Sequence, residues 1–153
     1  MAENFRITVG LPDLAATTAL GARIAAVLKA GDTVTLAGDL GAGKTTLARA
    51  ILRALGVAES VPSPTFTLVQ NYQAGGIAVS HYDLYRLDQP SQIHELGLEE
   101  ALEDGAVLVE WPERAERYLP PDALRVSLDG QDGARRAVLE GPARWHSLES
   151  AHV

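Results

Sequence analysis

The chain contains no cysteine, so it can form neither a disulfide framework nor a thiolate metal site. No apolar run approaches the roughly 18–20 residues that a membrane-spanning helix needs. The segment from Met1 to Arg6 lacks the basic and apolar parts of a signal peptide. Lysine is scarce, with two in 153 residues, and the net charge is −7. We therefore expect a cytoplasmic protein without membrane contact and without a large nucleic-acid surface of its own.

The composition that remains is that of an ordinary globular domain. Hydrophobic residues make up 46% of the chain and charged residues 22%. The length suits one domain with a substantial core. Residues after Gly141 show no periodicity, so we expect a single domain over residues 1–141 and a loose tail over 142–153.

One motif carries specific chemistry. Residues Gly38–Thr45 fit the pattern G-x-x-x-x-G-K-[ST]. Residues 33–37 before it read as a buried strand, and residues 46–52 after it read as a helix, which is the order that a phosphate-binding loop requires. Glycines let backbone N–H groups face the phosphates, and the helix N-terminus adds positive charge. Lys44 would reach the β- and γ-phosphates, and the Thr45 hydroxyl would bind Mg²⁺. The motif predicts binding of a nucleoside triphosphate.

The remaining segments alternate between strand and helix patterns. The wholly apolar run 106–109 is typical of a central strand covered on both faces, and a helical stretch begins at Pro90. Two hairpins are predicted by alternating strands around turn residues, at 65–72 with 77–82 and at 124–128 with 135–139. We expect an α/β fold: a P-loop NTPase-like three-layer sandwich with a mixed central sheet and added antiparallel hairpins.

Hydrolysis would require acidic groups near the loop. Glu110 closes the apolar strand, where an acid commonly supports Mg²⁺, although Asp is the usual residue. Asp83 follows another strand and could touch the metal, orient water, act as a general base or cap a turn. His81 is a weaker candidate, because a lone histidine at a strand end is more often structural.

Two further features have open interpretations. The segment 63–67 is either a strand entry or a loop that senses the γ-phosphate, with Thr65 or Thr67 offering a hydroxyl. Trp111, next to Glu110, is either a core residue or a surface anchor for a partner.

Several segments occur in the order seen in one family. They are Gly38–Thr46, Ser63–Val69, His81–Leu87, Glu95–Leu98 and Val109–Pro112. The chain thereby resembles the TsaE (YjeE) family, bacterial ATPases of the tRNA threonylcarbamoyladenosine pathway, over nearly the whole domain. The resemblance implies an ATP-hydrolysing accessory protein that works with the TsaB–TsaD pair. That pair modifies N6 of adenosine 37, so tRNA would be contacted indirectly, through the complex, and hydrolysis would drive repeated turnover.

The resemblance also implies roles for individual residues. Thr45 and Glu110 would bind Mg²⁺, and Asp83, Glu110 and Lys44 would act in catalysis. Trp111 matches a family tryptophan that matters for activity, and a glutamate at position 110 agrees with the family. The phosphates would contact Gly41, Ala42, Gly43, Lys44, Thr45 and Thr46.

At two places, the residue that would contact the nucleotide in the family can be matched to either of two residues in this sequence. The segment before the first helix would supply Leu14 or Thr17. The last hairpin would supply Arg135 or Arg136.

Other functions are compatible with the same loop. A small-molecule kinase shares it, but the chain is short and shows no arginine-rich lid. A nucleotide-gated binding module with incidental hydrolysis is a third hypothesis. A GTPase is disfavoured, because the sequence has no N-K-x-D or T-K-x-D run to read guanine. We expect slow hydrolysis by the isolated chain, with Arg86 and Arg114 as candidate internal donors of positive charge.

Overall fold

The computed structural model describes residues 4–39, 42–57, 68–74, 76–130 and 134–150. Its strands (β), α-helices (α) and 3₁₀ helices (η) are, in chain order, β1 (Asn4–Leu11), α1 (Leu14–Val27), β2 (Thr33–Ala37), α2 (Lys44–Leu55), β3 (Val69–Ala74), β4 (Ile77–Asp83), η1 (Pro90–His94), α3 (Leu98–Asp104), β5 (Gly105–Glu110), η2 (Pro112–Arg114), η3 (Glu116–Tyr118), β6 (Leu124–Asp129), β7 (Arg135–Pro142), η4 (Ala143–Trp145) and α4 (Ser147–Ser150).

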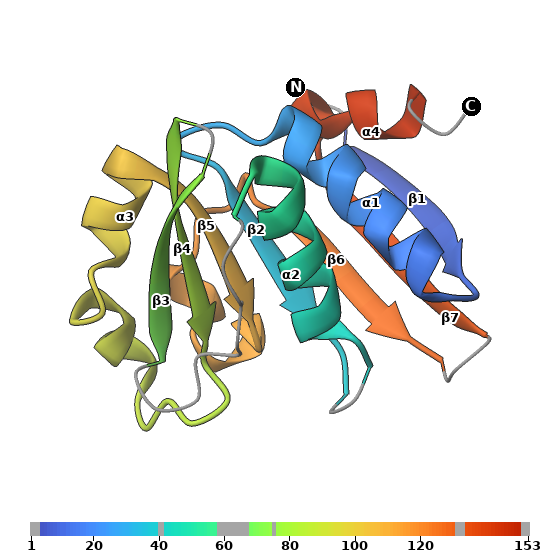
Figure 1. Ribbon diagram of the computed structural model, residues 1–153. Coiled ribbons are helices and arrows are strands. Elements are labelled where there is room, and N and C mark those ends of the chain that lie inside the picture. The colour runs from blue at the N-terminus through green and yellow to red at the C-terminus, as the bar shows by residue number, and fades with distance from the viewer. Residues whose placement is uncertain (1–3, 40–41, 58–67, 75, 131–133, 151–153) are drawn as a thin grey trace.

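The strands form one mixed sheet of seven, in the order β1-β7-β6-β2-β5-β4-β3. The four central strands, β6, β2, β5 and β4, are parallel. The antiparallel pairs β3–β4, β6–β7 and β1–β7 flank them. Figure 1 shows the four parallel strands ending at the same edge of the sheet, where α2 begins. The site is built at this edge, as in other α/β folds.

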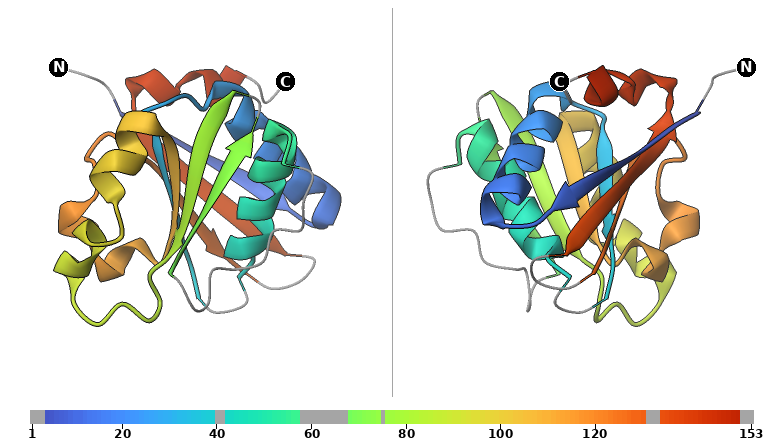
Figure 2. Two further views of the ribbon diagram at one scale, coloured as in Figure 1. Left: turned by 60° about the vertical axis from the view of Figure 1, so that its left-hand side comes forward. Right: turned by 90° about the vertical axis from the view of Figure 1, so that its right-hand side faces the viewer.

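Helical elements cover the sheet on both faces, as the two views of Figure 2 show. Helices α1 and α2 lie on one face, and α3 lies on the other with the 3₁₀ helices η1, η2 and η3. Alternate residues of β5 belong to different cores: Leu108 packs in the cluster under α1 and α2, whereas Val107 and Val109 pack in the cluster under α3. All residues of β5 are buried, as expected for a central parallel strand. The predicted α/β fold class and both hairpins are confirmed, although residues 65–67 of the first predicted strand lie outside the described residues.

The helical stretch predicted from Pro90 is interrupted. A 3₁₀ helix ends at His94, and Gly97, with φ 78°, precedes α3. The left-handed conformation of this glycine stops one helix and allows the next to start in another direction.

Helix α1 packs unusually close to α2. A Cβ atom on Gly21 would lie 2.5 Å from the Cβ of Ala50, so only glycine permits this approach.

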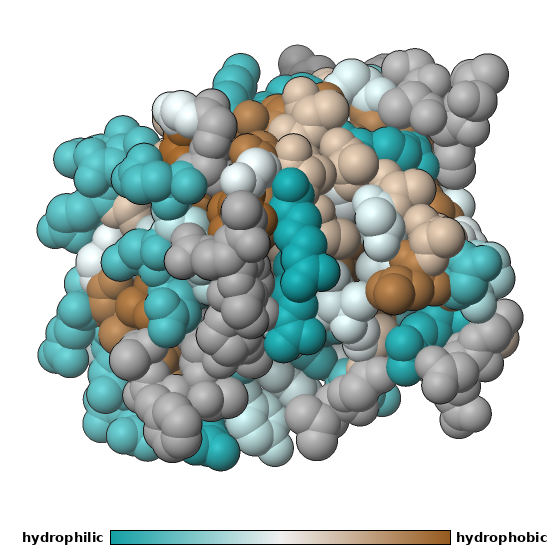
Figure 3. All heavy atoms as spheres, in the orientation of Figure 1, coloured by the Kyte–Doolittle hydropathy of each residue, from teal (hydrophilic) through white to brown (hydrophobic). Residues whose placement is uncertain are grey.

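The outer surface of α1 is apolar, whereas α2 presents a hydrophilic column (Figure 3). The described residues include no helix that could span a membrane.

The described part of the C-terminal segment, up to Ser150, differs from the loose tail expected over residues 142–153, of which 151–153 lie outside the described residues. The chain forms η4 and α4 after β7, and Trp145 and Leu148 are fully buried. The indole Nε1 of Trp145 donates a hydrogen bond to the carbonyl oxygen of Asp122 at 3.0 Å. The sequence does not predict this, because the segment is too short for a periodic pattern and its stability comes from burial of Trp145 and Leu148.

We expect Trp145→Ala to destabilise the domain by about 3–5 kcal/mol, because it removes a buried aromatic side chain. Trp145→Phe, the control, keeps most of the packing and loses the hydrogen bond to Asp122, for a cost of roughly 1 kcal/mol. Urea denaturation followed by circular dichroism measures both. Equal stability of Trp145→Ala and the parent chain would show that the segment is not part of the folded core.

Candidate functional site

The glycines of the phosphate loop have backbone conformations that other residues rarely adopt. Gly38, directly after β2, has φ 145°, and a Cβ there would lie 2.5 Å from the carbonyl oxygen of Leu128. Gly43, the N-cap of α2, has φ 103°. Such angles allow a loop to turn its N–H groups inward and strain any residue with a side chain. The loop shape depends on these two glycines. Gly41, also predicted here, lies outside the described residues.

The Lys44 side chain folds back over this loop. Its Nζ donates hydrogen bonds to the carbonyl oxygens of Gly38 at 2.6 Å and Asp39 at 2.9 Å, and it lies 4.0 Å from the centroid of the Trp111 ring. Burial lowers the pKa of Lys44, and nearby carboxylates, with Glu110 the largest contributor, oppose that shift. The site thus holds a desolvated amine at the position where the motif places the phosphates.

A buried carboxylate joins this loop to the sheet. Glu110 ends β5 and is only 2% exposed. The hydroxyl of Thr45, in the first turn of α2, donates a hydrogen bond to Glu110 Oε1 at 2.8 Å. An ionised carboxylate can only accept, so the lone pairs of the Thr45 hydroxyl are not used in this contact. The structure therefore brings together the two residues predicted to bind Mg²⁺.

The second oxygen of Glu110 has a contact that the sequence did not predict. His81, in β4, is fully buried, and its Nε2 lies 2.6 Å from Glu110 Oε2. The available signal was the two-residue spacing between His81 and Asp83, which places both side chains on one face of a strand. That spacing does not show what lies opposite on the neighbouring strand.

Asp83 lies at the same edge of the sheet. It pairs with Glu110 in the parallel register of β4 and β5. Its Oδ1 accepts a hydrogen bond from the backbone N–H of Tyr85 at 3.1 Å. The turn-capping interpretation of Asp83 is therefore present in the structure, and the register of β4 and β5 places Asp83 beside Glu110.

Trp111 forms an aromatic pair beside Lys44. Its φ of 60° is unusual for a residue with a side chain, and its ring lies 4.8 Å from that of Tyr85 between centroids. Trp111 is partly buried, and Tyr85 is 43% exposed. Trp111 is therefore neither a fully buried core residue nor a freely exposed one, because its ring packs against Lys44 and Tyr85 and also reaches the surface. Tyr85 was not predicted.

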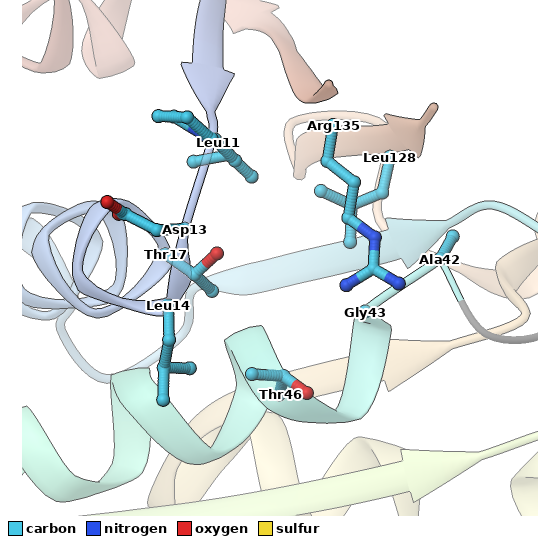
Figure 4. A pocket seen from close by; sticks show the side chains of 10 residues that line it. Leu11, Asp13, Leu14, Thr17, Ala42, Gly43, Thr46, Leu128 and Arg135 are labelled. Carbon is cyan, nitrogen blue, oxygen red and sulfur yellow. The ribbon is translucent and has the colours of Figure 1, made fainter. Parts of the chain in front are cut away.

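A pocket of about 210 Å³ lies beside the loop. Figure 4 shows its walls: the start of α1, the start of α2, the ends of β1 and β6 and the start of β7, with the Arg135 guanidinium directed toward Gly43. The lining residues are Leu11, Pro12, Asp13, Leu14, Thr17, Ala42, Gly43, Thr46, Leu128 and Arg135. The pocket gives room for the remainder of a ligand whose phosphates occupy the loop.

The pocket is lined by both candidates on α1 but by only one of the two arginines. Leu14 and Thr17 both line it, as do the predicted loop residues Ala42, Gly43 and Thr46. Of the two arginines, Arg135 lines it, whereas the exposed Arg136 donates a hydrogen bond from Nε to Asp129 Oδ1 at 2.8 Å. Neighbouring residues of a strand point to opposite faces, so only one of the pair can reach the pocket. Thr65 lies outside the described residues.

The oxygen donors at the loop fit Mg²⁺. Among the residues that the structure describes, no group of three or more His, Cys, Asp or Glu side chains could hold a metal ion. Mg²⁺ commonly takes one or two protein oxygens and completes its shell with water and phosphate oxygens. The adjacent hydroxyl of Thr45 and carboxylate of Glu110 are such a pair.

A strand, a phosphate loop, a helix and an acid at the end of a neighbouring parallel strand define a P-loop NTPase-like α/β protein. The family model "Threonylcarbamoyl adenosine biosynthesis protein TsaE" matches residues 11–138. The chain therefore belongs to the TsaE family, proteins of tRNA threonylcarbamoyladenosine biosynthesis.

Individual relatives agree with this assignment. The TsaE protein of Rickettsia conorii is 45% identical over 121 residues, which are 78% of this chain and 69% of the relative. That of Haemophilus influenzae is 42% identical, over 69% of this chain and 68% of the relative. The crystal structure of Bacillus subtilis YdiB is similar with a TM-score of 0.78 and 30% identity, covering 99% of this chain and 95% of that one.

We expect Thr45→Val to destabilise the ligand-free chain by about 1–3 kcal/mol, because the buried Glu110 carboxylate loses a hydrogen-bond donor. Thr45→Ser keeps the hydroxyl and should stay close to the parent stability. Urea denaturation in the absence of ligand and metal compares the three chains. If valine and serine were equivalent, the hydroxyl would not stabilise Glu110.

Proposed function

We propose that the chain is a Mg²⁺-dependent ATPase that supports the tRNA N6-threonylcarbamoyladenosine modification. The observation that carries this proposal is the contact between Thr45 Oγ1 and Glu110 Oε1, which unites the phosphate loop with an acid from β5. A loop that only bound an anion would not need a buried carboxylate beside it, since that carboxylate repels anions unless a cation intervenes.

The nucleotide would extend from the loop into the adjoining pocket. Its phosphates would meet the backbone N–H groups at the start of α2, where the helix dipole favours negative charge. Its sugar and base would lie toward Leu14 and Thr17, which line the pocket on α1. Arg135, directed toward Gly43, would supply the positive charge that closes the phosphate region from the side of β7.

The residues around the loop would divide the hydrolytic work. Thr45 and Glu110 would hold Mg²⁺, which neutralises charge on the phosphates when it is bound. Lys44 would exchange the carbonyl oxygens of Gly38 and Asp39 for phosphate oxygens, and burial would strengthen that attraction. Asp83, at the same sheet edge, would orient the attacking water or accept its proton.

Partner proteins would complete the cycle. We propose the TsaB–TsaD pair as the partner, with tRNA reached through that complex and the cytoplasm as the location. A net charge of −7 favours protein contact over direct tRNA contact. The pair of exposed Tyr85 and partly buried Trp111 supports a partner contact beside the loop, because aromatic residues dominate interface energetics. Slow hydrolysis by the isolated chain would follow if the partner orders the remaining groups.

The two arginines of the last hairpin test the nucleotide position. We expect Arg135→Ala to weaken ADP binding about ten- to a hundredfold, as loss of a charge-assisted hydrogen bond does. Arg136→Ala removes the same charge one residue away and should bind ADP like the parent chain. Isothermal titration calorimetry measures both. Equal weakening would mean that overall charge, rather than the pocket, sets the affinity.

Asp83 tests hydrolysis. We expect Asp83→Asn to bind ATP normally and to lower the hydrolysis rate roughly 10²–10⁴-fold, the range for loss of a general base. With the TsaB–TsaD pair and tRNA, it should modify fewer tRNA molecules per complex over many turnovers. Full modification by this variant would show that hydrolysis is dispensable and that the chain is a nucleotide-gated binding module. Transfer of labelled phosphate to a metabolite would instead favour a kinase.

A further inference from the structure

Glu110 is held from both sides. One carboxylate oxygen, Oε1, accepts from the Thr45 hydroxyl at 2.8 Å, and the other, Oε2, lies 2.6 Å from His81 Nε2. His81 is fully buried and Glu110 is 2% exposed. Each oxygen therefore has its own partner, from α2 in one case and from β4 in the other.

The chemistry of this contact assigns its donor. An ionised carboxylate can only accept, so pairing with ionised Glu110 requires the His81 tautomer that carries its hydrogen on Nε2. The other ring nitrogen, Nδ1, is buried and has no hydrogen-bond partner among the described residues. The ring thus makes one directed polar contact in the described part of the chain, and that contact is to Glu110.

No other residue of β4 makes this contact in the structure. Asp83, which pairs with Glu110 in the strand register, turns Oδ1 to the backbone N–H of Tyr85. An ionised carboxylate at this position has no hydrogen to donate to a second carboxylate. Position 81 is therefore where β4 places a donor against Oε2.

We infer that His81 is a positioning residue for Glu110. Its Nε2–H fixes the carboxylate so that Oε1 faces Thr45 and the cation that this pair would hold. Outer hydrogen bonds of this kind orient metal-binding carboxylates, and their loss commonly costs about 10–100-fold in metal affinity or activity. The inference rests on the proposed Mg²⁺ site, and it gives a specific task to a histidine that the sequence alone would leave as a structural residue.

Three substitutions of His81 test this role. His81→Leu fills similar space without a donor. His81→Gln places its amide nitrogen near the position of Nε2, so it can still donate to Glu110. His81→Asn is the matched control, because its shorter amide corresponds to Nδ1 and does not reach the carboxylate.

The measurement is Mn²⁺ binding to the full chain in the presence of ADP, followed by the electron paramagnetic resonance signal of free Mn²⁺. We expect His81→Leu and His81→Asn to weaken Mn²⁺ binding about 10–100-fold, and His81→Gln to restore most of the affinity. ADP binding without metal should change little in all three. Thermal unfolding of the same samples, without metal, shows how far each variant is folded.

The outcomes separate this inference from the proposed function. If the parent chain with ADP bound no Mn²⁺, the proposed function itself would fail. If the parent bound Mn²⁺ and the folded leucine variant bound it equally well, only the role of His81 would be wrong. Equal losses in the glutamine and leucine variants would also overturn it, since a purely steric role does not distinguish a donor at Nε2 from an apolar group.

Discussion

The burial of one charged group, the Glu110 carboxylate, constrains the functional edge of the molecule. A carboxylate removed from water is costly unless donors compensate it. Here the donors come from two other elements, the first turn of α2 through Thr45 and strand β4 through His81. Three segments that are distant in sequence must therefore meet at one point, and this meeting fixes the phosphate loop against the ends of the parallel strands.

Two carbonyl groups of the phosphate loop accept hydrogen bonds from the loop's own lysine. The Lys44 ammonium lies against two loop carbonyls and the Trp111 ring, so its charge is partnered before any ligand arrives. An anion at the loop would have to compete with these contacts, which would lower its net gain on binding. The same contacts hold the side chain ready, so little conformational entropy remains to be lost when an anion replaces the carbonyls.

The fold was largely predictable because its signals are local. An apolar run marks β5, and a strand–loop–helix motif marks the start of α2. Which arginine enters the pocket was not predictable, since Arg135 and Arg136 alternate faces and only the observed register assigns them. The His81–Glu110 contact was not predicted for a similar reason. The two residues lie 29 positions apart in neighbouring strands, and a local sequence pattern does not indicate which residues face each other across strands.

The pocket draws its walls from nearly the whole length of the chain, from Leu11 at the end of β1 to Arg135 at the start of β7. During synthesis, Leu11 leaves the ribosome long before Arg135, its partner in the antiparallel pairing of β1 and β7. Such distant pairings form slowly compared with local helices and turns. A ligand of this pocket therefore recognises only a completed domain, and its binding would stabilise the whole fold rather than the loop alone.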